Sequence, residues 1–213
     1  MVKIMDEKSQ LLQLEDHSKP RPKPLGLLHT FYVSGVIEDA KEYNDWFDTI
    51  RNAGETDIIK LHINSPGGDL FTAIQFLRVL GETNATVIAS VEGACMSAAT
   101  MLFMSAHQYE ISEHSMFMFH NYSGIAIGKG GEMYDNITHE RKWSEKIMRN
   151  VYKDFLTEDE IKSILENKDI WMEGEEVLRR LKLRIEKNEK KNVRKPNNAK
   201  PKSKPTRAKP TTK

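Results

Sequence analysis

Apolar positions in the first part of the chain follow the 3.6-residue period of a helix that buries one face. Residues 38–53 place large apolar side chains at positions i, i+3, i+4 and i+7, namely Tyr43, Trp46, Phe47 and Ile50. This stripe predicts an amphipathic helix. Gly54 directly follows it and is suited to end it.

Short β-branched runs then alternate with further helical segments. Residues 58–63 and 85–91 are short and apolar, which is typical of buried strands. Predicted helices follow them at residues 70–80 and 96–106. Strands that alternate with helices favour right-handed crossovers and a mostly parallel sheet.

Residues suited to helix ends frame several of these segments. Asp69 is a suitable N-cap and Gly81 a suitable C-cap for the helix at 70–80. Residues 157–160 read Thr-Glu-Asp-Glu, a capping box that predicts the start of another helix. A last helix is predicted at 175–183.

The stretch between these helices completes the predicted fold. Residues 108–111 and 115–119 read as two short strands, and residues 132–155 as a long, charged helix. Together the elements predict a single α/β domain without an internal repeat.

Positive charge is concentrated at the C-terminal end. Residues 187–213 contain eleven Lys and Arg and one acid, a net charge of +10, whereas the whole chain carries +1, so residues 1–186 carry −9. Seven of the eight prolines lie before residue 25 or after residue 195. We therefore predict a folded domain at 29–186, a flexible N-terminal segment at 1–28 and a basic, disordered tail at 187–213.

The composition excludes several classes of protein. Cys95 is the single cysteine, so no intramolecular disulfide can form, and no His or Cys spacing is typical of a metal site. We expect no metal and no other cofactor. No apolar run approaches the roughly 18–20 residues of a membrane span, and no signal-peptide core is present, so a cytoplasmic location without membrane association is expected.

Ser97 is the main candidate for chemistry. It lies between the predicted strand at 85–91 and the predicted helix that follows, where a hydroxyl can be presented as a nucleophile beside backbone N–H groups. Residues 63–68, which read Ile-Asn-Ser-Pro-Gly-Gly, join another strand to another helix and would expose N–H groups of the same kind. In acyl transfer the second N–H donor usually follows the nucleophile, here Ala98. Taken alone, the glycine loop also fits an ordinary tight turn.

Two downstream residues could complete a catalytic set. His120 closes the apolar run at 116–119, so it lies at a strand end, where it could act as a base or simply pack. Asp169 lies between two helical segments and could orient an imidazole, but its spacing alone is no better than that of Asp154 or Asp159. Residues 124–131, which are glycine-rich, have the wrong spacing for a phosphate-binding P-loop and read as a flexible hairpin or a substrate-lining loop.

The chain resembles the proteolytic subunit of the Clp protease family (ClpP). The matching segments are Ile-Asn-Ser-Pro-Gly-Gly at 63–68, Gly93 with Ser97 four positions later, His120 after Met-Phe-Met-Phe, and Lys-Asp-Ile-Trp-Met at 168–172. The resemblance runs from about residue 29 to residue 183.

The resemblance implies a site and a fold. Ser97 would be the nucleophile, His120 the general base and Asp169 its orienting acid, and the N–H groups of Gly68 and Ala98 would form the oxyanion hole. Gly67, Gly124 and Gly128 would line the substrate. The implied fold is a crotonase-like, ClpP-like layered α/β domain with a protruding handle helix, supplied by residues 132–155.

The resemblance also implies an assembly and partners. The subunits would form two stacked heptameric rings around a chamber that degrades polypeptides, with residues 1–28 lining an axial pore and an AAA+ unfoldase as a partner. The chain has Asn121-Tyr122 where the family usually has Gln-Pro after its histidine, and Ala98-Ala99 where it usually has Met-Gly. Such departures, with a basic appendage, would suit a divergent and specialised member, such as a phage-encoded one.

The predicted function is therefore a serine endopeptidase. Two alternatives from other classes stay open at this stage. A crotonase-type acyl-CoA hydratase or isomerase would share the fold and the paired N–H donors. A non-catalytic ring could use the basic tail to hold nucleic acid, without reading its sequence because the tail has no aromatic residues.

Overall fold

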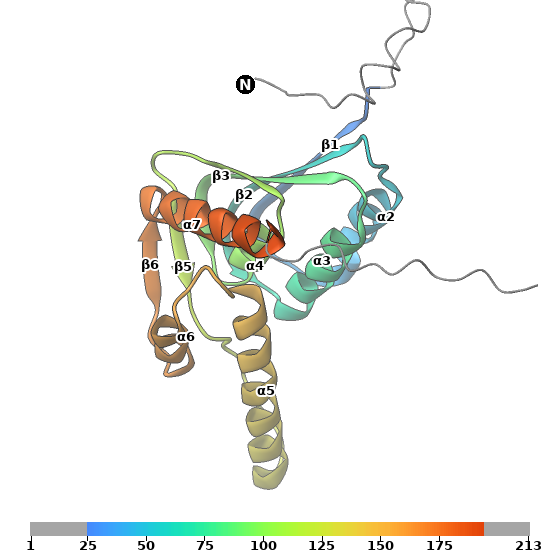
Figure 1. The fold of residues 1–213 in the computed structure, drawn as a ribbon. Coiled ribbons are helices and arrows are strands. Elements are labelled where there is room, and N and C mark those ends of the chain that lie inside the picture. Colours follow the sequence, from blue (N-terminus) through green and yellow to red (C-terminus); the bar gives the residue numbers. More distant parts are fainter. Residues whose placement is uncertain (1–24, 194–213) are drawn as a thin grey trace, which may run out of the picture. The chain divides into compact units, whose positions relative to one another are not determined.

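The computed structural model describes residues 25–193 and divides into two compact units, Met1–Ser115 and Met116–Lys213 (Figure 1). Most of the predicted N-terminal segment 1–28 and most of the predicted basic tail 187–213 lie outside the described residues. The single domain predicted at 29–186 stays a prediction, and we describe each unit by itself.

The first unit is built on four parallel strands, β1 (Leu28–Ile37), β2 (Ile58–Gly68), β3 (Thr86–Met96) and β4 (Gln108–Ile111). β2 lies between β1 and β3, and β4 pairs with the other edge of β3. The predicted parallel arrangement is confirmed. β1 was not predicted, because only three of its ten residues, Phe31, Val33 and Ile37, are buried and its apolar pattern is correspondingly weak.

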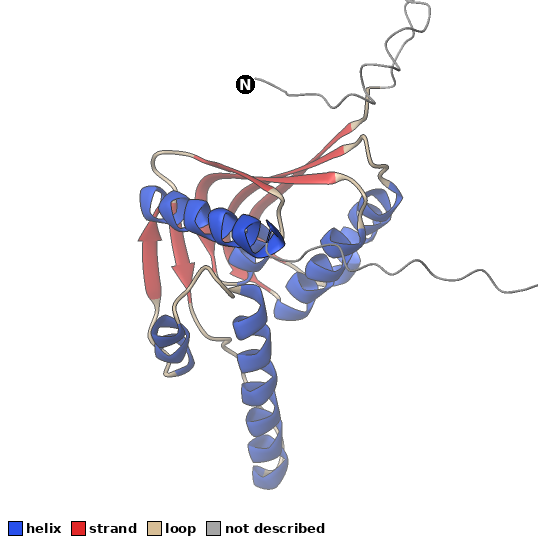
Figure 2. Cartoon of the chain, viewed as in Figure 1, coloured by secondary structure: helices blue, strands red, loops and turns tan. Residues whose placement is uncertain are grey.

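Helices cover one face of this sheet (Figure 2). They are a 3-10 turn η2 (Ala40–Tyr43), α2 (Asn44–Asn52), α3 (Leu70–Glu82) and α4 (Ala98–Met104). The predicted N-cap of α3 is confirmed, since the Asp69 carboxylate accepts a hydrogen bond from the Thr72 N–H at 2.7 Å. The predicted C-cap at Gly81 is wrong, because α3 continues to Glu82 and Thr83 caps it in an extended conformation.

The predicted apolar stripe at 38–53 packs as an aromatic cluster. The centroid of the Phe47 ring lies 4.8 Å from that of the Phe76 ring of α3, and the centroid of the Tyr43 ring lies 5.2 Å from the same Phe76 centroid. Phe47 and Phe76 are almost fully buried. Burial of one such side chain contributes about 1.5–3 kcal/mol, so this cluster holds α2 and α3 together beneath the sheet.

Strands β2 and β3 run further than the sequence predicts. β2 extends through Pro66 to Gly68, because Val36 and Ile37 of β1 pair with Gly67 and Gly68. The turn predicted at residues 64–68 is therefore the irregular end of a strand. A register shift between Ser34 and Val36 accommodates it.

The second unit contains β5 (Met116–Phe119), α5 (Gly130–Val151), α6 (Glu158–Leu165), β6 (Ile170–Glu173) and α7 (Gly174–Val193). The long helix predicted at 132–155 is α5, which begins two residues before the predicted start and ends four residues before the predicted end. Its side chains are almost all accessible, since only Ser144 is buried. β6 was not predicted, and it pairs antiparallel with β5.

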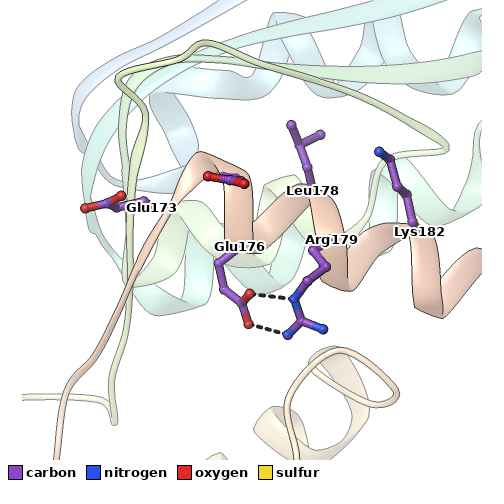
Figure 3. A pocket seen from close by; sticks show the side chains of 6 residues that line it. Glu173, Glu176, Leu178, Arg179 and Lys182 are labelled. Carbon is purple, nitrogen blue, oxygen red and sulfur yellow. Dashed lines mark hydrogen bonds and ion pairs between the residues drawn. The ribbon is translucent and has the colours of Figure 1, made fainter.

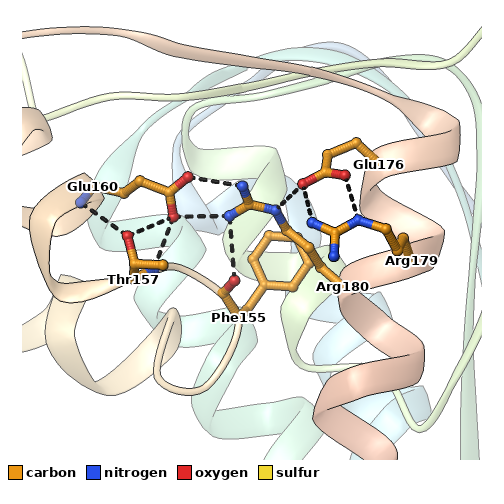
Figure 4. A network of polar contacts seen from close by, with 6 residues as sticks. All are labelled: Phe155, Thr157, Glu160, Glu176, Arg179 and Arg180. Carbon is orange, nitrogen blue, oxygen red and sulfur yellow. Dashed lines mark hydrogen bonds and ion pairs between the residues drawn. The ribbon is translucent and has the colours of Figure 1, made fainter.

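The predicted capping box of α6 is confirmed and forms part of a polar network (Figure 4). The Thr157 hydroxyl accepts from the Glu160 N–H at 3.2 Å, and the Glu160 carboxylate accepts from the Thr157 N–H at 2.8 Å. Arg180 of α7 donates two hydrogen bonds to Glu160, both at 2.8 Å, and one to Glu176 at 2.6 Å. Arg180 lowers the pKa of Glu160. This network joins α6 to α7.

Candidate active site

Ser97 occupies an unusual backbone conformation at the junction of β3 and α4. Its φ is 54° and its ψ is −128°, although it is not a glycine. A serine held in a sparsely populated conformation on a sharp strand-to-helix turn is typical of a nucleophile whose hydroxyl must project from the turn. The side chain is half-buried, and the Ser97 carbonyl accepts hydrogen bonds from the Thr100 N–H at 2.9 Å and hydroxyl at 2.6 Å.

Gly67 packs directly against this turn. A Cβ atom added at Gly67 would lie 2.6 Å from the Ser97 Cβ, 2.8 Å from the Met96 carbonyl oxygen and 3.0 Å from the Ala98 nitrogen. Real Cβ atoms do not approach backbone this closely, and the φ of Gly67 is +99°. Only glycine therefore allows the end of β2 to lie beside the Ser97 turn.

Gly68 is packed as tightly on its other side. A Cβ atom added there would lie 2.2 Å from the Ile37 carbonyl oxygen. The next residue, Asp69, donates its N–H to that same oxygen at 2.8 Å. The two glycines thus allow β1, β2 and the Ser97 turn to meet.

Side chains next to the glycines hold this arrangement. The buried Ser65 hydroxyl accepts from the Gly67 N–H at 3.1 Å, and the Asn64 side-chain oxygen accepts from the Ala94 N–H at 3.0 Å. A Cβ atom at Gly93 would lie 2.7 Å from that Asn64 oxygen. Asn64, Ser65 and Gly93 were part of the recognised motif, but their supporting role could not be read from spacing.

Cys95 is two residues from Ser97 and does not compete with it as a nucleophile. Its side chain is fully buried, and burial raises the pKa of the thiol far above its ordinary value. A buried thiol of this kind is inert.

His120 directly follows β5 and Asp169 directly precedes β6, and these two strands pair antiparallel. Phe119 pairs with Ile170 at the end of the ladder. In an antiparallel pair the following and preceding residues face one another, so His120 and Asp169 occupy the next position. His120 is half-buried and Asp169 is exposed. The short strand β6, which was not predicted, brings the segment that carries Asp169 beside the end of β5. A contact between the His120 and Asp169 side chains stays a prediction.

The predicted site residues therefore form two groups, one in each unit. Ser97, Ala98, Gly67 and Gly68 lie together in the first unit. His120 and Asp169 belong to the second, each one residue beyond the last β5–β6 pair. Joining of the two groups into one catalytic set stays a prediction.

The predicted substrate-lining glycines lie in a segment that is neither helix nor strand. Gly124 and Gly128 are exposed, and the two isoleucines between them, Ile125 and Ile127, are more than 90% exposed. Their role in substrate contact stays a prediction.

A separate pocket lies along the start of α7. It has a volume of about 480 Å³ and is lined by Glu173, Glu175, Glu176, Leu178, Arg179 and Lys182 (Figure 3). Arg179 makes two hydrogen bonds to Glu176, both at 2.7 Å. None of the predicted site residues lines this pocket.

Two features are absent from residues 25–193, the part of the chain that the structure describes. Within that range, no group of three or more His, Cys, Asp or Glu side chains is placed to hold a metal ion. Within the same range, no helix is long and apolar enough to cross a membrane.

Comparison with known proteins identifies the family of the chain. The sequence model of the Clp protease family matches residues 38–180, a span that includes all eight predicted site residues. A comparison with curated proteins found no match. The matched span covers two thirds of the chain, and its mixed α/β architecture is the ClpP-like, crotonase-like fold. The chain therefore belongs to the Clp protease family, a family of peptidases.

Proposed function

We propose that the protein is a serine endopeptidase that hydrolyses peptide bonds through an acyl-enzyme. The Ser97 oxygen attacks the scissile carbonyl carbon while its proton passes to His120. The tetrahedral intermediate then collapses, and the amine leaves with the proton from His120. A water molecule, deprotonated by His120, hydrolyses the ester and regenerates Ser97.

The observation that carries this proposal is the conformation of Ser97. A φ of 54° at a residue with a Cβ atom costs about 1–2 kcal/mol, and here the neighbouring strand end is fitted to it through Gly67. Such strain is retained where the side chain must project toward a substrate. An ordinary strand-to-helix turn would not require it.

The oxyanion hole is proposed to use the N–H groups of Gly68 and Ala98. The Asp69 N–H points to β1, where it is bonded to Ile37. The Gly68 N–H, one residue earlier at the end of β2, is proposed to face the Ser97 turn, against which the neighbouring Gly67 packs. Loss of one such donor costs on the order of 10²–10³ in rate.

Asp169 is proposed to orient His120, with which it shares the end of the β5–β6 ladder. Gly67, Gly124 and Gly128 are proposed to line the bound peptide. Members of the Clp protease family generally form oligomeric rings and act on polypeptides. We extend this to a chamber formed by copies of this chain, fed by an unfoldase.

A fluorophosphonate label, followed by mass spectrometry, tests the nucleophile directly. We expect a single modified peptide that contains Ser97, and we expect Ser97→Ala to abolish both labelling and turnover of a fluorogenic peptide. Ser105→Ala is the matched control, because Ser105 lies at the other end of α4 and its hydroxyl donates to the Met101 carbonyl. Unchanged turnover in Ser97→Ala would refute the proposal.

The same samples test the assembly and the acyl-CoA alternative. Native mass measurement should give one oligomer for the wild type and for Ser97→Ala. Saturable binding of a CoA thioester by a protein that resists the serine label would instead favour the crotonase-type enzyme.

A further inference from the structure

Asn121, the residue directly after His120, links three separate segments of the second unit. Its side-chain nitrogen donates to the Asn167 side-chain oxygen at 3.2 Å. Its side-chain oxygen accepts from the Tyr122 N–H at 3.0 Å and from the Ser144 hydroxyl at 3.4 Å. These partners fix which end of the amide faces which neighbour. The end of β5 is thereby tied to α5 and to the turn before β6.

Asn167 lies two residues before Asp169 in a well-defined turn. Its φ is +64°. Its N–H donates to the Ile164 carbonyl at 2.9 Å, and the Lys168 N–H donates to the Ser163 carbonyl at 3.0 Å. This pair of bonds is the Schellman motif that ends α6, with Asn167 at the left-handed position. The motif fixes the direction in which the chain enters β6.

The identity of residue 167 is not explained by the turn alone. Glycine is the usual residue at this left-handed position, because it has no Cβ atom to strain. Asparagine tolerates the conformation less well, so its side chain requires another reason. Within the described part of the chain, the Asn167 side chain accepts a hydrogen bond from Asn121.

We propose that the Asn121–Asn167 amide pair positions His120 against Asp169. The inference rests on the proposed serine-peptidase function. Asn121 is covalently next to His120, and Asn167 precedes Asp169 by two residues, so the bond between the amides draws the base and its orienting acid together at the open end of the β5–β6 ladder. Both asparagines are positioning residues, and neither is assigned contact with the substrate.

The buried Ser144 hydroxyl of α5 lies 3.2 Å from the Arg141 carbonyl oxygen and 3.4 Å from the Asn121 side-chain oxygen, and it shares its single proton between these two acceptors. It is the one buried side chain of α5 among the described residues.

Asn167→Gly is the decisive variant, because it removes the amide while it keeps or improves the left-handed turn. We expect kcat for a fluorogenic peptide to fall about threefold to tenfold, the effect of one lost hydrogen bond. KM should change by less than about twofold, and the melting temperature should stay equal or rise. The separate variant Asn167→Asp keeps a side-chain oxygen that accepts from Asn121, so its kcat should be restored to near the wild-type value.

Asp154→Gly is the matched control, since Asp154 is another left-handed residue of the same unit, with a φ of 63°, and forms an ion pair with Lys187. Its kcat should equal that of the wild type. The positioning role is refuted if Asn167→Gly keeps wild-type kcat, or if Asn167→Asp fails to restore it. Activity that survives Ser97→Ala would refute the peptidase mechanism itself, so the two failures are distinguishable.

Discussion

Replacement of Gly67 by alanine tests the packing on which the Ser97 turn depends. The added Cβ atom would meet the Ser97 Cβ at 2.6 Å and the Met96 carbonyl oxygen at 2.8 Å, and Gly67 has a φ of +99°. It would also lie 3.0 Å from the Ala98 nitrogen. The Met96 oxygen and the Ala98 nitrogen belong to the backbone of the turn, so no side-chain rotation relieves these contacts.

The expected cost has two parts. The left-handed conformation costs an alanine about 1–2 kcal/mol, and the forced contact adds about 1–3 kcal/mol. We therefore expect Gly67→Ala to lower the free energy of unfolding by about 2–5 kcal/mol. Relief of the contact requires a movement of the turn, and a displacement of about 1 Å at a reacting group can cost about 10²-fold in rate.

The control variant Gly35→Ala separates the cost of the left-handed conformation from the cost of the forced contact. Gly35 also has a positive φ, +79°, but a Cβ atom added there would meet nothing within 4 Å. This control should lose only the conformational part, about 1–2 kcal/mol, and should keep wild-type activity. Urea unfolding followed by circular dichroism measures the stabilities, and peptide turnover measures the activities. Equal stability and equal turnover in the two variants would refute the packing argument.

Three further changes follow from other parts of the structure. Gly81→Ala should raise the free energy of unfolding by about 0.4–1 kcal/mol, because Gly81 lies within α3 with open space beside it; a loss of stability in urea unfolding would contradict this. Arg180 lowers the pKa of Glu160 below its ordinary 4.5, so the stability from this pair is complete above pH 4.5 and is lost as the pH falls further. In Arg180→Met the free energy of unfolding should therefore fall less between pH 4.5 and lower pH than in the wild type. Arg179 pairs with Glu176 instead, so Arg179→Met should keep the contribution of Glu160. Cys95 should resist alkylation in the native state and react only on unfolding, so fast modification of the folded protein would contradict its burial.

Local signals predicted the helices well. The carboxylate of Asp69 and the pair Thr157 and Glu160 act within three residues of the chain, so the sequence contains the whole interaction. The C-cap prediction at Gly81 was wrong because a glycine near the end of an apolar stripe is typical of a C-cap, yet the helix has no steric reason to end there.

Strands that depend on distant partners were harder to predict. The end of β2 reads as a turn because Pro66 and the following glycines are turn formers, but Val36 and Ile37, some 30 residues earlier, pair with it and keep it extended. β6 has four residues and a single buried side chain, Met172, so no periodic pattern marks it.

The same distinction separates the parts of the candidate site. Ser97 and His120 could be proposed from sequence because their chemistry lies in the side chain and their positions follow apolar runs. The conformation of Ser97 could not be predicted, since neither its φ of 54° nor the close approach of Gly67 from another strand is visible in the local sequence. Asp169 could not be distinguished from other acids by spacing, because only the β5–β6 pairing brings its segment to the end of β5. In each case the missing information is a contact between segments distant in sequence. A substitution that changes such a contact while leaving the catalytic side chains intact, such as Gly67→Ala, is therefore a more specific test of the site than removal of a catalytic side chain.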